Sequence, residues 1–330
     1  MDTILVTGGA GFIFSNFIHY MLNNYPEYKI VNLDKLTYAA NLSNLHGLEK
    51  NDNYKFYKGD ICNKKLVEKL IKEEKIDTII NGAAESHVDR SIFDAGSFVK
   101  TDVLGVYNLL EAAKKFNIEK FIQISTDEVY SEIEIGSFKE TDKLTPKNPY
   151  AASKAGGDLL ALSYVKTYGL PVMITRSTNN YGYYHHPEKF IPKAIVYGIL
   201  NKKIPVYGNG KAVRDWLFVK DNCEAIDTIL HKGKIGEIYN IAGKQEMENI
   251  AVVKMILDKL GKSNGLIEFV KDRPGHDLRY SLDIDKLRGL GWKPKTTFED
   301  GIDQTISWYQ QNSEWWKPIM KNQIDFHKKF

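Results

Sequence analysis

Short apolar runs alternate with amphipathic segments along the first half of the chain. Five runs have the length and composition of buried parallel strands: Thr3–Thr7, Ile30–Leu33, Lys55–Tyr57, Thr78–Asn81 and Phe121–Ser125. Helical patterns lie between them, as in Leu66–Glu74 and Val103–Lys115. This alternation predicts an α/β fold built on a doubly wound (Rossmann) parallel sheet. Two later runs are expected to add a sixth and a seventh strand, Pro171–Arg176 and Glu237–Ile241.

After Asn179 the pattern becomes less regular. The aromatic and Pro-containing segment Tyr183–Pro192 suits a loop over a ligand, Asn201–Val213 reads as strand and turn, and Lys271–Arg279 as a charged loop. Three helices are expected, at Val252–Leu260, Asp283–Gly289 and Phe298–Gln310. We therefore expect two interleaved domains. The first comprises residues 1–178 with a strand and helix from 214–244, and the second, a smaller α/β substrate domain, comprises 179–213 and 245–330.

Composition narrows the class of protein. With 330 residues, of which 43% are hydrophobic, the chain can bury a large core. A net charge of +3, with Lys and Glu intermixed, predicts no nucleic-acid surface. Cys62 and Cys223 are the only cysteines, which fits a reducing cytoplasm. The first residues enter a strand directly, and no apolar run reaches the length of a membrane span. We expect a cytoplasmic protein without a membrane segment.

A glycine-rich turn follows the first strand. Gly8 and Gly11 allow the backbone to approach a pyrophosphate, and Phe12 and Ile13 begin the helix whose N-terminus would bind it. The third glycine of the usual fingerprint is replaced by Phe14. We expect its ring to push the first helix outward or to be accommodated by smaller neighbours, and to turn away from the pyrophosphate.

Residues at the ends of the next strands complete a dinucleotide site. Asp34 follows the second strand, where its carboxylate can accept from a ribose 2′-hydroxyl and would repel a 2′-phosphate, so NAD is favoured over NADP. The third strand ends at Asp60 and Ile61, near the expected adenine edge. The fourth is followed by the small residues Ala83 and Ala84. The sequence therefore predicts bound NAD.

Two motifs indicate the chemistry. The fifth strand runs into Ser-Thr-Asp-Glu-Val-Tyr, in which Asp127 and Glu128 are adjacent carboxyl groups whose pKa values mutual repulsion and burial can separate. Tyr150 and Lys154 are four residues apart and thus lie on one helix face. Together with NAD, the motifs suggest an enzyme that oxidises a substrate, eliminates a group and returns the hydride. No Cys, His or Asp spacing matches a metal site, and the adjacent His185 and His186 would point to opposite sides of a strand.

These motifs resemble the extended short-chain dehydrogenase/reductase superfamily and, within it, the dTDP-glucose 4,6-dehydratases. The segments that match, in the family's order, are TGGAGFI, LDKLTYAAN, AAESHVDRS, STDEVY, YAASKAGGD, NNYG, PEKFIP, VRDW and DRPGHD. The adjacent Asp-Glu pair separates them from sugar-nucleotide epimerases of similar fold. Besides Phe14, the chain departs from the family at Ser131, at Tyr183 and along the segment 131–139.

The resemblance implies a conversion of dTDP-glucose to the 4-keto-6-deoxy sugar, with roles for five catalytic residues, Thr126, Asp127, Glu128, Tyr150 and Lys154. The implied NAD contacts are Gly8, Gly11, Phe12, Ile13, Asp34, Lys35, Leu36, Thr37, Asp60, Ile61, Ala83, Ala84, Ser86, Thr101, Ser125, Tyr150, Lys154 and Asn180. The implied substrate contacts are Ser86, Thr126, Asn179, Lys189, Phe190, Pro205, Tyr207, Arg214, Asn249, Arg273 and His276.

The sequence also bears on the oligomeric state and leaves more than one substrate and function open. Helices 103–115 and 151–166 have more apolar positions than one core-facing stripe needs, and related enzymes pair such helices, so we expect a homodimer with a four-helix contact. Thymine and uracil differ by one methyl group, worth only about 1–3 kcal/mol in a close-fitting pocket, so UDP-glucose stays a candidate substrate. An NAD-dependent epimerase or decarboxylase, or a non-catalytic nucleotide-sugar-binding relative, are the other readings.

Overall fold

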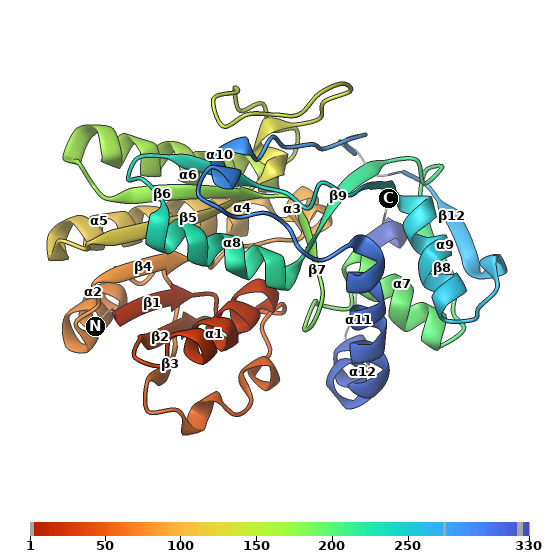
Figure 1. Ribbon diagram of the computed structural model, residues 1–330, viewed down its shortest axis with the longest axis horizontal. Coiled ribbons are helices and arrows are strands. Elements are labelled where there is room, and N and C mark those ends of the chain that lie inside the picture. Colours follow the sequence, from red (N-terminus) through yellow and green to blue (C-terminus); the bar gives the residue numbers. More distant parts are fainter. Residues whose placement is uncertain (1–2, 273–274, 322–325, 330) are drawn as a thin grey trace.

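The computed structural model describes residues 3–272, 275–321 and 326–329 (Figure 1). Its main sheet has seven strands in the order β10-β6-β5-β4-β1-β2-β3, and every neighbouring pair is parallel. The strands are β1 Thr3–Thr7, β2 Lys29–Asp34, β3 Tyr54–Lys58, β4 Thr78–Asn81, β5 Lys120–Thr126, β6 Val172–Ser177 and β10 Ile238–Ile241. The predicted doubly wound α/β sheet is confirmed, and its predicted strands agree with these bounds to within a few residues.

Helices cover both faces of this sheet. One face is covered by α1 Phe12–Asn24 and α8 Val219–Lys232, the other by α2 Lys64–Glu74, α5 Val106–Phe116 and α6 Pro149–Tyr168 (Figure 1). The inner strands are mostly apolar because both of their faces are buried, whereas the edge strand β3 is only partly buried and contains Lys55 and Lys58. Parallel strands place all their carboxyl ends at one edge, so Thr7, Asn81 and Thr126 come to the same side of the sheet.

A smaller group of elements lies beyond that edge, at the right of Figure 1. It contains a three-stranded sheet and a two-stranded sheet around a separate apolar cluster with helices α7, α9 and α11. The bounds are β7 Asn179–Tyr181, α7 Phe190–Ile199, β8 Ile204–Tyr207, β9 Val213–Phe218, β11 Glu246–Glu248, α9 Asn249–Lys259, β12 Ile267–Val270, α11 Phe298–Gln311 and α12 Ser313–Lys321. The short helix α10 Asp285–Arg288 packs instead on the main sheet, where Leu287 lies in its core (Figure 1). Between β9 and β11 the chain returns to the main sheet as α8 and β10.

The helix expected at 103–115 begins as an α-helix only at Val106 and is preceded by other helical segments. Two short helices, α3 Val88–Phe93 and α4 Ala95–Val99, lead into a π-helical segment, Lys100–Gly105, before α5 starts. A π turn widens the helix and often marks a functional site. Here it lies against the glycine pair of α6, since a Cβ on Gly157 would lie 2.6 Å from the Asp102 carbonyl oxygen.

Within the described parts of the chain, no helix is both long enough and apolar enough to cross a membrane.

Phe14 is accommodated by a glycine on the neighbouring strand end. Its ring is buried in the core between α1 and the sheet, in edge contact with Phe17. A Cβ placed on Gly82 would lie 2.1 Å from the Phe14 ring. Of the two outcomes expected for Phe14, the structure therefore has the ring accommodated by a small neighbour. The Phe14 ring thus fills the space left by the missing side chain of Gly82, the residue after β4.

This fit predicts strong coupling between the two positions. We expect Gly82→Ala to lower the free energy of unfolding by about 1–3 kcal/mol through overpacking. In a Phe14→Ala background the same substitution should cost close to nothing, because the ring is gone. Urea denaturation of the four proteins measures this. An equal cost in both backgrounds would contradict the proposed fit.

Candidate active site

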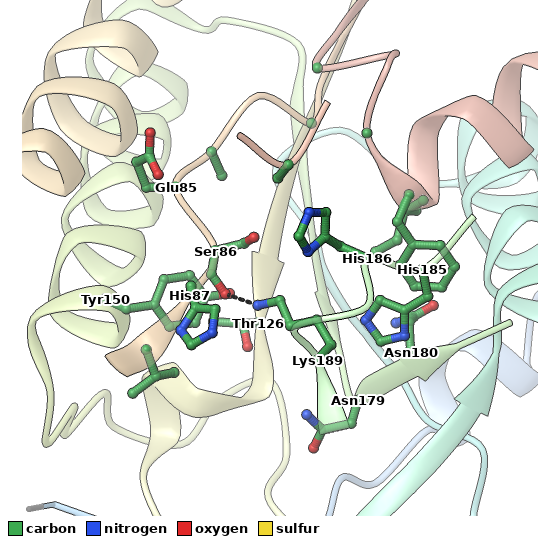
Figure 2. Close-up of a pocket in the computed structure, with 18 of the residues that line it drawn as sticks. Glu85, Ser86, His87, Thr126, Tyr150, Asn179, Asn180, His185, His186 and Lys189 are labelled. Carbon is green, nitrogen blue, oxygen red and sulfur yellow. Dashed lines mark hydrogen bonds between the residues drawn. The ribbon is translucent and has the colours of Figure 1, made fainter. Parts of the chain in front are cut away.

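A cavity of about 450 Å³ runs along the carboxyl edge of the sheet and into the smaller group of elements. Figure 2 shows its central part, where residues from the β4 and β5 ends face the 179–189 segment. Of the candidate residues that the structure describes, all line this cavity except Leu36. Arg273 lies outside the described residues. The sequence-based candidates are therefore brought together in one place.

The phosphate-binding turn leaves room for a ligand at the start of α1. Gly8 has a positive φ of 73°, and a Cβ there would lie 2.9 Å from the Ala83 backbone, so only glycine fits. No side chain caps the N-terminus of α1 at Gly11. The free backbone N–H groups of this helix end can bind a pyrophosphate.

Asp34 is held rigidly at the tip of β2. Its carboxylate accepts hydrogen bonds from the backbone N–H groups of Ala10, at 2.9 Å, and Leu36, at 2.7 Å. Burial raises the carboxyl pKa, while these hydrogen bonds act in the opposite direction. Lys35 pairs with Asp60 at 2.9 Å, joining the second and third strand ends. Leu36 itself packs against the core with φ 59°, so its link to the site is through its N–H group.

Helix α6 positions the phenol and the ammonium. Asn148 caps it by accepting from the Ala151 N–H at 2.9 Å, and proline follows the cap, so the helix start is well defined. Tyr150 and Lys154 both face the cavity. The Lys154 ammonium donates to the Ile124 carbonyl at 2.6 Å. Burial, and then the charge of Glu128, hold the pKa of Tyr150 well above its usual range, with Thr126 hydrogen bonding acting in the opposite direction.

The two carboxyl groups lie on one turn of 3₁₀ helix, Asp127–Tyr130, which follows β5 directly. The Thr126 hydroxyl donates to Asp127 at 3.1 Å and accepts from the Glu128 N–H at 3.3 Å. Asp127 is buried, and burial followed by the charge of Glu128 raises its pKa well above the usual value. Glu128 accepts from the Asn148 amide at 3.3 Å. The turn thus presents a buried carboxyl group with a raised pKa beside a second carboxyl group.

The nucleotide end of the cavity is basic and aromatic. Lys189 donates to the Ser86 carbonyl at 2.6 Å, a bond drawn in Figure 2. Arg214 donates to the Val213 and Asp277 carbonyls and stacks over Tyr280, 4.5 Å from the ring centroid. These contacts fix two cations in a cavity wall, where they can meet a diphosphate.

Three departures from the family pattern keep their bulk away from the cavity. Tyr183 turns outward and donates to Gln304 at 2.9 Å. The segment 131–139 runs beside 279–283, and Phe138 donates to the Ser281 carbonyl at 2.9 Å. Ser131, at the end of the turn that contains Asp127 and Glu128, has φ 82° and ψ −155°, a conformation otherwise confined to glycine. Strain is therefore stored next to the carboxyl pair.

Sequence reasoning missed several lining residues, among them His185, His186, Glu188 and Phe14. The strand assumed for His185 and His186 is wrong, because they lie in a loop, and both line the cavity. Their rings have different partners, Phe12 for His185 and Tyr38 for His186. His185 stacks on Phe12 with ring centroids 4.1 Å apart, and burial holds its pKa well below the usual range. The signal available was the aromatic character of the 183–192 segment, which was expected to lie over a ligand.

Comparison with known proteins identifies the class to which this fold and site belong. A family model described as GDP-mannose 4,6 dehydratase matches residues 5–305, and the chain belongs to that family. The resemblance to nucleotide-sugar dehydratases is thereby confirmed.

Individual relatives match nearly end to end. The Haloferax volcanii low-salt glycan biosynthesis protein Agl12 is 50% identical over 94% of this chain and 99% of its own. The Escherichia coli dTDP-glucose 4,6-dehydratase is 45% identical over 96% of both chains. Among solved structures, the Bacillus anthracis dTDP-glucose 4,6-dehydratase in complex with NAD has a TM-score of 0.91 and 49% identity, covering 97% of this chain and 100% of its own. DesIV from Streptomyces venezuelae, a dTDP-glucose 4,6-dehydratase with NAD and TYD bound, has a TM-score of 0.94 and 44% identity, with coverage of 96% and 99%.

Asp102 is a buried acid near the cavity. Asp102, in the π-helical segment, accepts from the Ser153 hydroxyl at 2.8 Å and from the Glu85 N–H at 3.2 Å. Burial raises its carboxyl pKa to about 6, and the nearby charge of Lys154 opposes this. In the unfolded chain the pKa returns to about 3.9.

Folding stability should therefore fall as the pH rises from about 4 to 6, since the folded state binds the proton more tightly. Asp102→Asn does not titrate, so its unfolding free energy relative to wild type should increase by about 2–3 kcal/mol between pH 4 and pH 7. Urea denaturation at both pH values tests this. The exposed Asp52→Asn is the control and should show no such change. A pH-independent difference for Asp102→Asn would disprove the assignment.

Proposed function

We propose that this protein is an NAD-dependent dTDP-glucose 4,6-dehydratase, a lyase that forms dTDP-4-keto-6-deoxyglucose. One observation supports the proposal most strongly: the carboxyl pair on the 127–130 turn and the Tyr150–Lys154 face of α6 open into the same cavity as the phosphate-binding turn. The near end-to-end likeness to dTDP-glucose 4,6-dehydratases supports the nucleotide.

The residues present fit NAD. Gly8 has no Cβ, which would strike Ala83, so the phosphate-binding turn can lie close to the end of β4. The N-terminus of α1 has no side-chain cap and can bind a pyrophosphate. The Asp34 carboxylate is fixed where a ribose would lie. When bound, NAD supplies the acceptor and later the donor of the hydride. Of the remaining contacts, Ser125 on β5 and Asn180 on β7 also line the cavity.

The side chains divide the work of the reaction. Tyr150 takes the proton from the C4 hydroxyl as C4 is oxidised, and Lys154 favours the phenolate through its charge. The ketone acidifies the C5–H bond, so Glu128 can remove that proton. Asp127, whose pKa burial raises, gives its proton to the departing C6 hydroxyl, which leaves as water. Thr126 donates to the C4 oxygen. Glu128 then returns its proton to C5, and the proton held by Tyr150 replaces, through solvent, the one that Asp127 lost. With bound NAD supplying the hydride for C6, there would be no net redox change.

Product mass is the direct test of this proposal. Incubation with dTDP-glucose should give a nucleotide sugar that has lost one water, and incubation with UDP-glucose a much smaller yield. Loss of water from UDP-glucose alone would reassign the nucleotide. An unchanged mass with both sugars would show that the protein does not dehydrate them.

Two variants should separate the steps. Asp127→Asn keeps the shape but lacks the acid, so C4 oxidation with a visible NADH absorbance should persist while water loss slows by about 10²–10⁴-fold. Tyr150→Phe should instead abolish the first step, so no NADH appears. Stopped-flow absorbance with mass analysis of the quenched sample measures both. Near-normal turnover of Tyr150→Phe would refute the assignment of the base.

We also propose a homodimer through a four-helix contact. Large apolar side chains are exposed along the α4–α5 run and on α6: Val99 (54%), Leu104 (46%), Tyr107 (39%) and Leu159 (59%). Burying such a surface against a second copy would remove it from water.

Leu104→Glu/Leu159→Glu should therefore yield monomers by light scattering. Phe269→Glu, at an equally exposed position on β12, should leave the mass unchanged. A monomeric wild-type protein would exclude this contact.

The domain division proposed from the sequence, 1–178 with 214–244 and 179–213 with 245–330, is supported by the separate apolar cluster of the smaller group, except that Leu282, Ile284, Leu287 and Trp292 pack in the core of the main sheet. The free thiols of Cys62 and Cys223 support the proposed cytoplasmic location.

A further inference from the structure

The face of α6 that presents Tyr150 and Lys154 continues one turn further to Asp158, which is also four residues on. Asp158 is fully buried. Its Oδ2 atom accepts from the Ser125 hydroxyl at 2.9 Å and from Arg176 Nε at 3.0 Å. Ser125 lines the cavity just before the carboxyl turn. Asp158 therefore joins the helix that presents the phenol to the strand that leads into the acid and base.

Arg176 extends this connection from β6 to the carboxyl turn itself. It is among the largest fully buried side chains of the described chain. Its guanidinium donates to the Tyr130 hydroxyl at 2.7 Å and lies 4.8 Å from the centre of that ring. Tyr130 is the last residue of the turn that begins with Asp127, and its hydroxyl donates to Asn240 at 3.0 Å. The strained Ser131 follows immediately.

A contribution to the free energy of folding does not by itself explain this network of Asp158, Arg176 and Tyr130. A buried ion pair is often no more stabilising than apolar residues of the same volume, because both charges lose their hydration. Its hydrogen bonds, however, have fixed directions. The reaction proposed above needs Tyr150 and Lys154, on one element, to meet the same sugar carbon atoms as Asp127 and Glu128, on another. Asp158 and Arg176 connect these two elements below the cavity.

We propose that Asp158 and Arg176 are positioning residues that hold the 127–130 turn in register with α6, and that they set the rate of dehydration without contributing to substrate binding. This inference rests on the proposed function. A misplacement of about 1 Å far from the chemistry can slow an enzyme by about 10²-fold, so the effect should be large.

The test replaces the pair by apolar residues. In Asp158→Leu/Arg176→Met no buried charge is left unpaired, so the protein should unfold at a denaturant concentration close to that of wild type. We expect kcat for dTDP-glucose to fall by about 10–100-fold with KM within about threefold. Lys29→Met/Glu74→Leu is the control and should keep kcat. It removes a partly exposed ion pair of 2.7 Å at the opposite end of the sheet, together with the contacts of Glu74 to Lys55 and Tyr57.

Arg176→Lys, with Asp158 intact, should keep part of the kcat that the double variant loses, since it keeps the charge beside Asp158 but cannot also donate to Tyr130 as the guanidinium does. Wild-type kcat in the apolar double variant would overturn the proposal. So would a loss of kcat that matches the unfolded fraction, or one that the Lys29/Glu74 control shares.

A second measurement does not depend on the substrate. Hydrogen exchange of the holoenzyme, followed by mass spectrometry, should show faster exchange in peptides covering 126–131 of the apolar double variant only. If wild type fails to dehydrate any sugar, the proposed function is wrong, and the exchange data still decide whether the network holds the turn. Unchanged exchange there would refute the positioning role by itself.

Discussion

The removal of water from the carboxyl ends of β5 and β6 governs the rest of the site. Burial, reinforced by the neighbouring charge of Glu128, raises the pKa values of both Asp127 and Tyr150 and so favours their protonated forms. In the proposed reaction the same buried edge therefore favours the acid and disfavours the base. The charge of the Lys154 ammonium would act on the phenol in the opposite direction. The fold supplies this edge for a simple reason: parallel strands end together, and the smaller group of elements covers them.

Phe14 and Ser131 show how the fold accommodates residues that depart from the expected motifs. Phe14 occupies the volume that Gly82 leaves free, so the phosphate-binding turn keeps its course. Ser131 has no such compensation and retains a glycine-like backbone. It is held by its neighbours on the turn, whose Tyr130 is anchored to Arg176 and Asn240. The strained backbone at Ser131 thus lies next to a buried hydrogen-bond network.

Most of the main sheet could be predicted, because buried parallel strands and amphipathic helices have distinct periods. The glycine turn, Asp34, the carboxyl pair and Tyr150–Lys154 could be placed because each follows a recognisable strand or helix start. Other features depend on contacts that no local pattern encodes. The π-helical segment shares the apolar spacing of the α-helix around it. The pairing of Asp158 with Arg176, and of Phe14 with Gly82, joins residues from different elements. His185 and His186 were misjudged because a loop was treated as a strand.

The order in which the chain visits its two groups of elements has a consequence for modularity. It leaves the main sheet after β6, returns after β9 to add α8 and β10, leaves again, and returns once more at α10. A fragment cut after the sixth strand would lack a sheet edge and expose the apolar side of α1 that Ile226 and Leu230 cover. Neither group of elements is therefore expected to fold alone or to be exchanged as a unit. Added domains would have to be joined at the chain ends or inserted into surface loops.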